Sequence, residues 1–293
     1  MRWSLALASG RVLQTGDGPG VMAILNVTPD SFSDGGRFRS AEEAAAEGVQ
    51  HADFGVAIVD IGGESTRPRG ATYGEGAREI SSNEEIGRVL PVISSLRRER
   101  PSLPISVDTR RLEVARAACD AGADIVNVVT GLAVPDDLLA LVAGRGAAIV
   151  LNHCRGTPQT TFEESSFSDV VSEVASDLDA ARARALSFGI PAEKILFDPG
   201  FGFGKKPGEN FALLSRLAEL APPGTPLVAG ASRKAFLGTV AGRPSSDRLP
   251  ESLAAAAVAV RAAVTHPLLL RVHDVEETIR FLDVVNEIGR AHV

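Results

Sequence analysis

A regular alternation of short, β-branched segments with longer segments of helical periodicity constrains the fold of this chain more than any other feature. Eight short segments have the composition of strands, and each is followed by a segment with apolar residues three and four positions apart. Most strand candidates are continuously apolar, which is typical of parallel strands covered on both faces. The candidates are residues 21–27, 56–62, 104–109, 124–129, 147–153, 194–199, 226–232 and 268–274.

The segments between the strand candidates carry helix start signals. Ser40 precedes Glu43 and Ser82 precedes Glu85 by three residues, and both pairs match a capping box. Eight strand–helix units in 293 residues favour a closed (β/α)8 TIM barrel over an open, doubly wound sheet. Residues 1–20 are predicted to form an N-terminal β-hairpin that closes the bottom of the barrel. We therefore expect an α/β fold in which residues 1–293 form a single domain.

The composition excludes several classes of protein. The formal net charge of -7 and the pI near 5.4 argue against a nucleic-acid-binding surface. No apolar stretch approaches the ~18 residues of a membrane span, and the N-terminal apolar run is too short for a secretory signal. The cysteines are Cys119 and Cys154, and so few thiols suit a reducing compartment. We expect a cytoplasmic protein.

Polar side chains lie at or just beyond the C-terminal end of every predicted strand. In a TIM barrel these ends meet at one rim, where catalytic and binding residues gather. Each residue taken alone is more often a helix cap or a buried structural group. Polar groups from all eight strands at one rim favour a ligand site instead. The residues are Asn26, Glu64, Ser65, Thr66, Arg67, Asp108, Asn127, His153, Asp198, Ser232, Arg233, Lys234, Arg271 and His273.

Four of these residues have the chemistry to bind a flat, polar heterocycle. The carboxylates of Asp108 and Asp198 can accept hydrogen bonds from ring N–H and amino groups, while Asn127 and Lys234 can donate to a carbonyl or ring nitrogen. A pterin presents such an edge, and so does a purine. These residues predict a heterocycle site without deciding between the two.

Positive charge is predicted to gather beside this site. Arg67, Arg233, Arg271 and His273 would form a cluster suited to phosphate oxygens. The side-chain oxygen of Asn26 can coordinate Mg2+, which takes few protein ligands and leaves its other positions to water and phosphate.

Residues 198–206 are rich in glycine but do not match a nucleotide phosphate loop. Their glycines alternate, and neither Ser nor Thr follows Lys205 as the P-loop spacing requires. We interpret the segment as a loop whose glycines let the backbone lie close to a ligand, with Phe201 and Phe203 as apolar walls.

Six literal motifs extend over nearly the whole chain. They are LNVTPDSFSDGG (25–36), DIGGESTRP (60–68), SVDT (106–109), FDPGFGFGK (197–205), SRKAFLG (232–238) and RVHDV (271–275). In content and order they resemble the signature segments of the dihydropteroate synthase family of pterin-binding proteins. The resemblance implies an enzyme of folate biosynthesis that condenses (7,8-dihydropterin-6-yl)methyl diphosphate with p-aminobenzoate to give 7,8-dihydropteroate and pyrophosphate.

The resemblance also implies roles for individual residues. It makes Asp108, Asp198 and Lys234 catalytic, and assigns Asn26 to Mg2+ on the diphosphate. Asp34 and Arg67 would act from the first two loops. The pterin diphosphate would be bound by Thr66, Asp108, Asn127, Asp198, Lys234, Arg271 and His273. The p-aminobenzoate would be bound by Thr66, Pro68, Phe203 and Ser232. A homodimer is implied as well.

Three features depart from the family's pattern. Val128 stands where the family usually has Asp, and strand alternation points it away from a pocket that Asn127 faces. Cys154 replaces a methionine that lines the pterin pocket, and the smaller side chain is expected to loosen that wall modestly. The second loop carries extra residues, 69–81, which we expect to alter closure or access to the site.

Two other functions fit part of the pattern. A methyltetrahydrofolate-dependent methyltransferase also holds a pterin with Asp and Asn, but it has no use for the RVHDV segment or the Asn26 loop. A non-catalytic pterin-binding paralog is suggested by Val128, whereas the retained Asn26, Lys234, Arg271 and His273 argue for catalysis.

Overall fold

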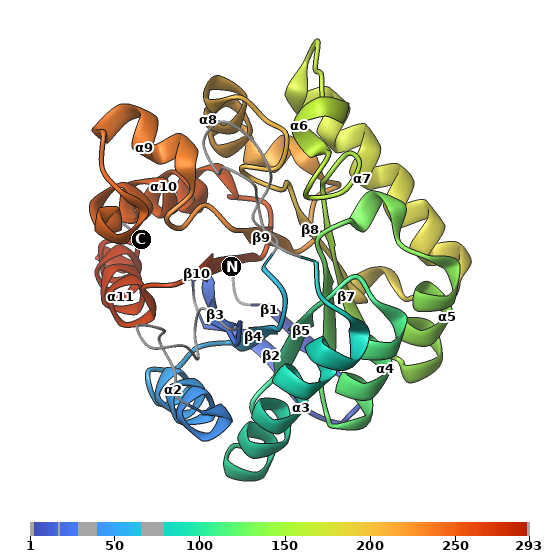
Figure 1. The fold of residues 1–293 in the computed structure, drawn as a ribbon. Helices are drawn as coiled ribbons and strands as arrows, with labels where there is room; N and C mark the ends of the chain where they lie inside the picture. The colour runs from blue at the N-terminus through green and yellow to red at the C-terminus, as the bar shows by residue number, and fades with distance from the viewer. Residues whose placement is uncertain (1–2, 17, 29–39, 66–78, 292–293) are drawn as a thin grey trace.

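The computed structural model describes residues 3–16, 18–28, 40–65 and 79–291. Within these residues, eight parallel strands close into a barrel in the order β10-β3-β4-β5-β6-β7-β8-β9 (Figure 1). This arrangement confirms the predicted TIM barrel. The strands are β3 (Gly20–Asn26), β4 (Ile58–Gly62), β5 (Ile105–Asp108), β6 (Ile125–Val128), β7 (Ala148–Asn152), β8 (Ile195–Asp198), β9 (Leu227–Ala229) and β10 (Leu268–Val272).

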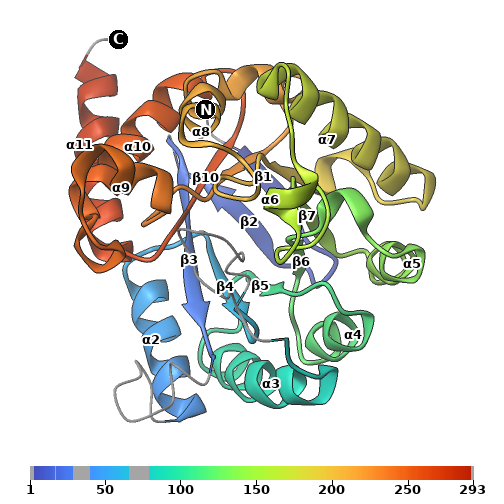
Figure 2. The same cartoon turned by 45° about the horizontal axis from the view of Figure 1, so that its top comes forward.

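Helices form a ring around the barrel (Figures 1 and 2). No helix in the described ranges is both long and apolar enough to cross a membrane. The α-helices are α2 (Ala41–Asp53), α3 (Ser82–Glu99), α4 (Leu112–Asp120), α5 (Asp136–Arg145), α6 (Thr161–Glu164), α7 (Val170–Ser187), α8 (Pro207–Ser215), α9 (Ala235–Ala241), α10 (Leu249–Ala262) and α11 (Val275–Ala291). Short 3-10 helices are η1 (Gly131–Ala133), η2 (Ala192–Lys194), η3 (Leu217–Leu220) and η4 (Ser245–Asp247).

Side-chain caps fix where two of these helices begin. Ser40 Oγ accepts a hydrogen bond from the backbone N–H of Glu43 at 3.3 Å, so the predicted cap of α2 is confirmed. The predicted cap of α3 is wrong by one residue. Ser81, whose backbone is extended, accepts from the N–H of Glu84 at 3.2 Å, and Ser82 lies in the first turn of the helix.

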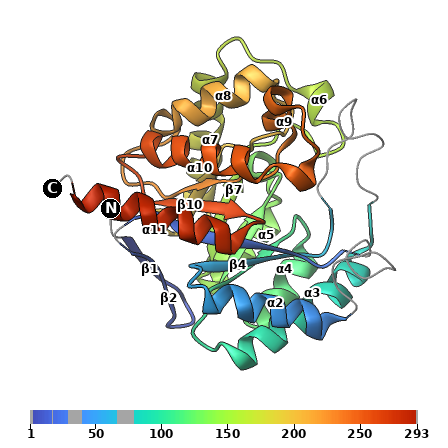
Figure 3. The ribbon, with the colours of Figure 1, turned by 90° about the vertical axis from the view of Figure 1, so that its left-hand side faces the viewer.

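The N-terminal hairpin closes the barrel interior from below. Strands β1 (Trp3–Ala6) and β2 (Val12–Thr15) pair antiparallel and lie at the end where the barrel strands begin (Figure 3). Leu5, Leu7 and Leu13 share one buried cluster with the inward-facing residues of the barrel strands. The predicted closing hairpin is therefore confirmed. The inward-facing residues of this cluster include Met22, Ile58, Ile125, Val150, Leu196 and Leu269.

The outer faces of the same strands pack against the helices. Val126 and Val128 of β6 belong to the large core cluster that the helices cover, whereas Ile125 belongs to the interior cluster. This alternation leaves the last inward-facing position of each strand for a site at the C-terminal end of the barrel. The parallel register brings four such positions to one level on neighbouring strands: Asn26, Gly62, Asp108 and Asn127.

Leu13→Ala is expected to lower the free energy of unfolding by about 2–5 kcal/mol, because Leu13 is fully buried between the hairpin and the barrel. The neighbouring Val12 is 49% exposed, so Val12→Ala is a matched control that should change it by less than about 0.5 kcal/mol. Urea unfolding of both variants measures the difference. Equal effects would show that the hairpin does not complete the core.

Candidate active site

A fully buried carboxylate, Asp60, lies at the centre of the polar layer at the C-terminal end of the barrel. It lies on β4 two positions beyond Ile58, which belongs to the interior cluster. Its Oδ2 accepts hydrogen bonds from Asn127 Nδ2 at 3.0 Å and from Arg271 Nε at 2.7 Å. Asp60 therefore links β4 to β6 and β10 and fixes the orientation of both partner side chains.

Asp108 shares Arg271 with Asp60. A terminal guanidinium N–H of Arg271 donates to Asp108 Oδ2 at 2.7 Å, while Asp108 Oδ1 has no hydrogen-bond partner among the described residues. Burial raises the pKa of Asp108 to about 7 against the opposing charge of Arg271, and Asp60 raises it further. Burial also disfavours the charged form of Arg271, but the two carboxylates outweigh it and raise its pKa. The site thus holds a permanent cation beside an acceptor oxygen that can bind a ligand.

Asp198 ends β8 and starts the glycine-rich loop. Its Oδ1 accepts a hydrogen bond from the backbone N–H of Gly200 at 2.7 Å. Burial raises the pKa of Asp198, and the Gly200 N–H and the charges of Arg271 and Lys234 oppose that shift. Only glycine fits at position 200, because φ is +67° and a Cβ would lie 1.9 Å from the carbonyl oxygen of His153. The tight turn therefore presents the Asp198 carboxylate to the barrel mouth.

Lys234 reaches the site from the turn that follows β9. Burial lowers its pKa to about 8 and Arg271 lowers it further, whereas Asp198 and Asp108 raise it. Its Nζ lies 4.4 Å from the centroid of the Phe203 ring, which is a cation–π distance. An ammonium on one face of an aromatic ring and beside two carboxylates can donate a hydrogen bond to a planar ligand.

Ser232 and His273 form a second polar pair at the mouth. Ser232 Oγ lies 3.2 Å from His273 Nδ1 and accepts from the backbone N–H of His273 at 3.3 Å. Burial lowers the pKa of His273 to about 3, and the charges of Arg233, Arg271 and Lys234 contribute. The imidazole is therefore neutral near pH 7. If the Ser232 hydroxyl donates to Nδ1, then Nε2 carries the proton and can donate to an anionic ligand.

The end of β3 fits a magnesium ligand. Asn26 is exposed, and a Cβ at Gly62 on the adjacent strand would lie 3.3 Å from Asn26 Oδ1 and 3.7 Å from Asp108 Cβ. Across the described ranges, no three His, Cys, Asp or Glu side chains converge as a protein-only metal cage requires. A single amide oxygen suits Mg2+ bound mainly by phosphate and water. The side chain of Asn26 is therefore suited to bind Mg2+, the role that the family resemblance implies for it.

Two residues predicted to face the ligand are buried elsewhere. His153 follows Asn152, the last residue of β7, so strand alternation turns it outward. Its ring is fully buried and contacts Asp177 and Lys205. Phe201 is 1% exposed and stacks on Phe236 of α9 at a centroid distance of 6.0 Å. Of the two predicted apolar walls, Phe203 is thus the one that the structure places near Lys234.

Arg233 and Glu64, both predicted at the rim, form ion pairs with the surrounding chain. Arg233 donates to Asp274 from Nε at 3.0 Å and also from a terminal nitrogen. Arg233 is thus held by Asp274 and lies near enough to His273 to help lower the pKa of that imidazole. Glu64 accepts from both terminal nitrogens of Arg111, at 2.9 and 2.8 Å, and from the backbone N–H of Ile80 at 3.2 Å. The side chain of Glu64 therefore binds the backbone at Ile80 and the guanidinium of Arg111, and does not face a ligand.

Val128 and Cys154 occupy the places that the sequence predicts. Val128 is fully buried in the core cluster between strands and helices, so its side chain points away from the face that Asn127 presents. Cys154 is 1% exposed and packs in a small cluster with Val129 and Phe203. It therefore lines the candidate site beside Phe203. The predicted residues Asp34, Thr66, Arg67 and Pro68, and positions 69–78 of the second loop, lie outside the described residues.

Sequence reasoning missed two residues of the site. Asp60 is the one charged residue in the apolar segment 56–62, and this feature of the sequence could have identified it. Lys205 is 3% exposed and lies under the glycine-rich loop. Its burial had no sequence signal, because lysine is almost always exposed.

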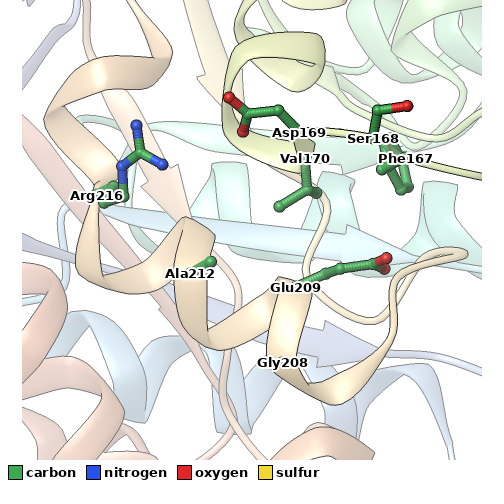
Figure 4. A pocket seen from close by; sticks show the side chains of 8 residues that line it. All are labelled: Phe167, Ser168, Asp169, Val170, Gly208, Glu209, Ala212 and Arg216. Carbon is green, nitrogen blue, oxygen red and sulfur yellow. The ribbon is translucent and has the colours of Figure 1, made fainter.

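A hollow of about 330 Å3 lies apart from the polar layer, between the start of α7 and the length of α8 (Figure 4). Its polar side chains already bind the protein. Asp169 caps α7 by accepting two backbone N–H groups, Glu209 accepts from the N–H of Lys206 at 2.6 Å, and Arg216 pairs with Glu219 at 2.6 Å. These contacts favour a structural role for the residues that line the hollow.

The chain is similar to proteins of one family along nearly its whole length. Residues 22–273 match the family described as "Pterin binding enzyme". The chain is 43% identical over 267 residues to the dihydropteroate synthase of Escherichia coli K12, covering 91% of this chain and 90% of that protein. It is 40% identical over 269 residues to the dihydropteroate synthase of Mycobacterium leprae, covering 90% and 92%.

Solved structures show the same similarity in three dimensions. Xanthomonas albilineans dihydropteroate synthase with 4-aminobenzoic acid superposes with a TM-score of 0.85 at 41% identity, covering 98% of both chains. The same enzyme in complex with 7,8-dihydropteroate superposes with a TM-score of 0.82 at 38% identity, covering 98% of this chain and 99% of that one.

Asp108→Asn should gain stability relative to the wild type as the pH rises from 5 to 8. The folded-state pKa of Asp108, about 7, lies above its ordinary value, so between about pH 4 and pH 7 the folded protein keeps a proton that the unfolded chain releases. The stabilising contribution of Asp108 is therefore complete below pH 4 and is lost as the pH rises through 7. Asparagine does not titrate. The measurement is the Tm of the variant minus the Tm of the wild type at both pH values, and a value that stays constant or falls as the pH rises would contradict the assignment.

Val128→Asp should destabilise the protein rather than increase its activity. The new carboxylate would be buried in an apolar cluster, at a cost of at least about 3 kcal/mol in the free energy of unfolding. Val128→Thr has a similar shape without the charge and is the control, with an expected cost of about 1–2 kcal/mol. Denaturant unfolding and activity should be measured together. Higher activity at unchanged stability would show that residue 128 faces the site after all.

Proposed function

The chain belongs to the dihydropteroate synthase family of pterin-binding enzymes, and we propose that the polar layer around Asp60 is its pterin site. Enzymes of this family are transferases of folate biosynthesis. The reaction joins (7,8-dihydropterin-6-yl)methyl diphosphate to p-aminobenzoate and releases pyrophosphate. The observation that carries the assignment of the site is the buried hydrogen-bonded network of Asp60, Asn127, Arg271 and Asp108.

Asp108, Asn127, Asp198 and Lys234 bind the pterin ring. The free oxygen of Asp108 and the carboxylate of Asp198 accept from ring N–H and amino groups. Asp60 takes one N–H of Asn127, which leaves the other N–H and the amide oxygen for the ligand. Lys234 donates to a ring nitrogen or the carbonyl oxygen. All four come from the carboxyl ends of different strands, which supports a single planar ligand between them.

Arg271 and His273 bind the diphosphate. Arg271 stays charged because two carboxylates raise its pKa, and the neutral His273 offers an N–H donor next to it. Asn26 would hold Mg2+ at this end of the site. When bound, the ion would supply positive charge that stabilises the leaving group. Thr66 contributes to this end of the substrate, as the family resemblance implies.

The p-aminobenzoate lies against Phe203, near Lys234 and Ser232. The 4.4 Å contact between Lys234 Nζ and the Phe203 ring supports an aromatic substrate beside the pterin. Ser232 forms a hydrogen bond with His273, so its hydroxyl lies between the aminobenzoate and the diphosphate. The resemblance implies that Thr66 and Pro68 also bind p-aminobenzoate, and that Asp34 and Arg67 act from the first two loops.

The chemical step is a displacement at the pterin methylene carbon. A bond forms from the aniline nitrogen to this carbon, the bond from the carbon to the diphosphate oxygen breaks, and the nitrogen then passes its extra proton to water. The carboxylates of Asp108 and Asp198 stabilise positive charge that develops on the pterin, while Arg271 and His273 stabilise the departing anion. The arylamine is neutral near pH 7, so no strong base is needed before attack.

We also propose a cytoplasmic homodimer. Val258 of α10 and Val284 and Ile288 of α11 are exposed by 41%, 60% and 55% on helices that are neighbours in the ring (Figure 1). Both cysteines are free thiols, which supports a reducing compartment. Light scattering of the purified protein tests the dimer, and a monomeric mass would contradict it.

The decisive experiment is an assay of the purified chain with both substrates and Mg2+. Pyrophosphate and 7,8-dihydropteroate should form in equal amounts. Binding of the pterin diphosphate without any product would favour the non-catalytic paralog. Methyl transfer from methyltetrahydrofolate, with no dihydropteroate formed, would favour the methyltransferase.

Asn26→Ala should raise the Mg2+ concentration that gives half-maximal activity by about tenfold, as expected for the loss of one polar contact to a charged group. Asn26→Asp keeps an oxygen ligand and is the matched control, which should retain tight metal dependence. Initial rates over a Mg2+ titration measure both. An unchanged titration for Asn26→Ala would remove Asn26 from the metal site.

A further inference from the structure

Lys205 is a buried lysine whose ammonium contacts neutral acceptors. It is 3% exposed, and within the described residues its Nζ has no carboxylate at ion-pair distance. The Nζ lies 3.0 Å from His153 Nδ1 and 3.3 Å from the carbonyl oxygen of His153. It also donates to the carbonyl oxygens of Gly200 at 2.9 Å and Phe203 at 3.1 Å. A buried ammonium is costly, and here its compensation is a set of bonds to two loops.

His153 connects Lys205 to Asp177 on α7. The ring is fully buried, with Nε2 3.1 Å from Asp177 Oδ2 and Nδ1 on Lys205. Burial lowers the pKa of His153 to about 4, and the charge of Lys205 contributes, so the ring is neutral near pH 7. A neutral ring with a carboxylate at Nε2 and an ammonium at Nδ1 has its proton on Nε2. The three side chains therefore form a directed chain in which Lys205 donates to His153 and His153 donates to Asp177.

The two carbonyl groups that Lys205 binds belong to the loop that shapes the pterin site. Gly200 accepts from Lys205 through its carbonyl oxygen and donates to Asp198 Oδ1 through its N–H, at 2.7 Å. Phe203 accepts from Lys205 through its carbonyl oxygen and holds its ring under Lys234. One ammonium thus binds both ends of the turn from Gly200 to Phe203.

We propose that Lys205 is a positioning residue for the pterin substrate, held by His153 and Asp177, which sets the glycine-rich loop so that Asp198 and Phe203 face the ligand. The proposal rests on the proposed function, because it takes Asp198 and Phe203 as substrate-binding groups. Lys205 itself is covered by the loop and acts through the residues that it holds.

The charges around Lys205 explain why its ammonium needs hydrogen-bond acceptors at every N–H. Burial lowers its pKa to about 7; Asp198 and Cys154 on neighbouring segments raise it, and Lys234 and Arg155 lower it. Arg155 pairs with Asp177 at 2.9 Å and lies 4.4 Å from the Phe167 ring centroid. The nearest positive charges thus destabilise the charged form of Lys205, whereas the carbonyl groups and the His153 nitrogen stabilise it.

Lys205→Met tests the proposal, because it keeps the length of the side chain and removes every donated hydrogen bond. Calorimetric titration should show an affinity for the pterin diphosphate about tenfold weaker than in the wild type. Lys206→Met is the matched control, since Lys206 is the next residue and is exposed. It should leave the affinity within twofold. A folded Lys205→Met variant with wild-type affinity would overturn the proposal. Binding is measured without turnover, so an inactive wild type that binds the pterin diphosphate would count against the proposed function alone.

A second measurement does not depend on whether Lys205→Met folds. Ring nitrogen signals of His153 in 15N-labelled wild-type protein near pH 6, between the pKa of His153 at about 4 and that of Lys205 at about 7, should show a neutral imidazole protonated on Nε2. A proton on Nδ1 would overturn the proposal, because Lys205 cannot donate to a protonated nitrogen. In Asp177→Asn, which changes a side chain that is 31% exposed, that tautomer should lose its preference and the pterin affinity should fall by about threefold. An unchanged tautomer together with an unchanged affinity would remove Asp177 from the chain.

Discussion

The candidate site depends on the buried carboxylate of Asp60. A lone charge at this depth would be prohibitively costly, and the two hydrogen bonds from Asn127 and Arg271 to one oxygen compensate for it. Arg271 depends in turn on Asp60 and Asp108, so no member of the network can be removed without leaving another unpaired. Such mutual dependence holds the side chains in place before a substrate arrives, and a site that is already ordered loses little entropy on binding.

The barrel strands contribute side chains from their two faces both to the core and to the candidate site. Inward-facing residues are apolar in the lower barrel, where the hairpin leucines complete the packing. They are polar at the C-terminal end of β5, β6, β8 and β10, at Asp108, Asn127, Asp198 and Arg271. Burial is the main cause of the shifted pKa values of Asp108, Asp198, Lys234 and His273. The same exclusion of water that shifts these values strengthens their interactions with charge that develops on a substrate.

The sequence predicted the barrel, its closing hairpin and the inward orientation of Asn127, because strand periodicity and literal motifs carry that information. It could not predict which polar residues at the strand ends turn away from the mouth. His153 faces outward because β7 ends at Asn152, one residue before the predicted end of the strand. Arg233 forms an ion pair with Asp274, which is distant in sequence. The burial of Lys205 was equally hidden, since it results from the conformation of a loop whose carbonyl groups happen to converge on one point.

The role of Asp60 is tested most directly by the affinity of Asp60→Asn for the pterin diphosphate. Asparagine has nearly the same shape but lacks the charge that Arg271 and Asn127 share. Calorimetric titration should show binding weaker than in the wild type by at least about tenfold, in a variant whose circular dichroism is unchanged. Wild-type affinity in that folded variant would contradict the central claim that the Asp60 network organises the pterin site.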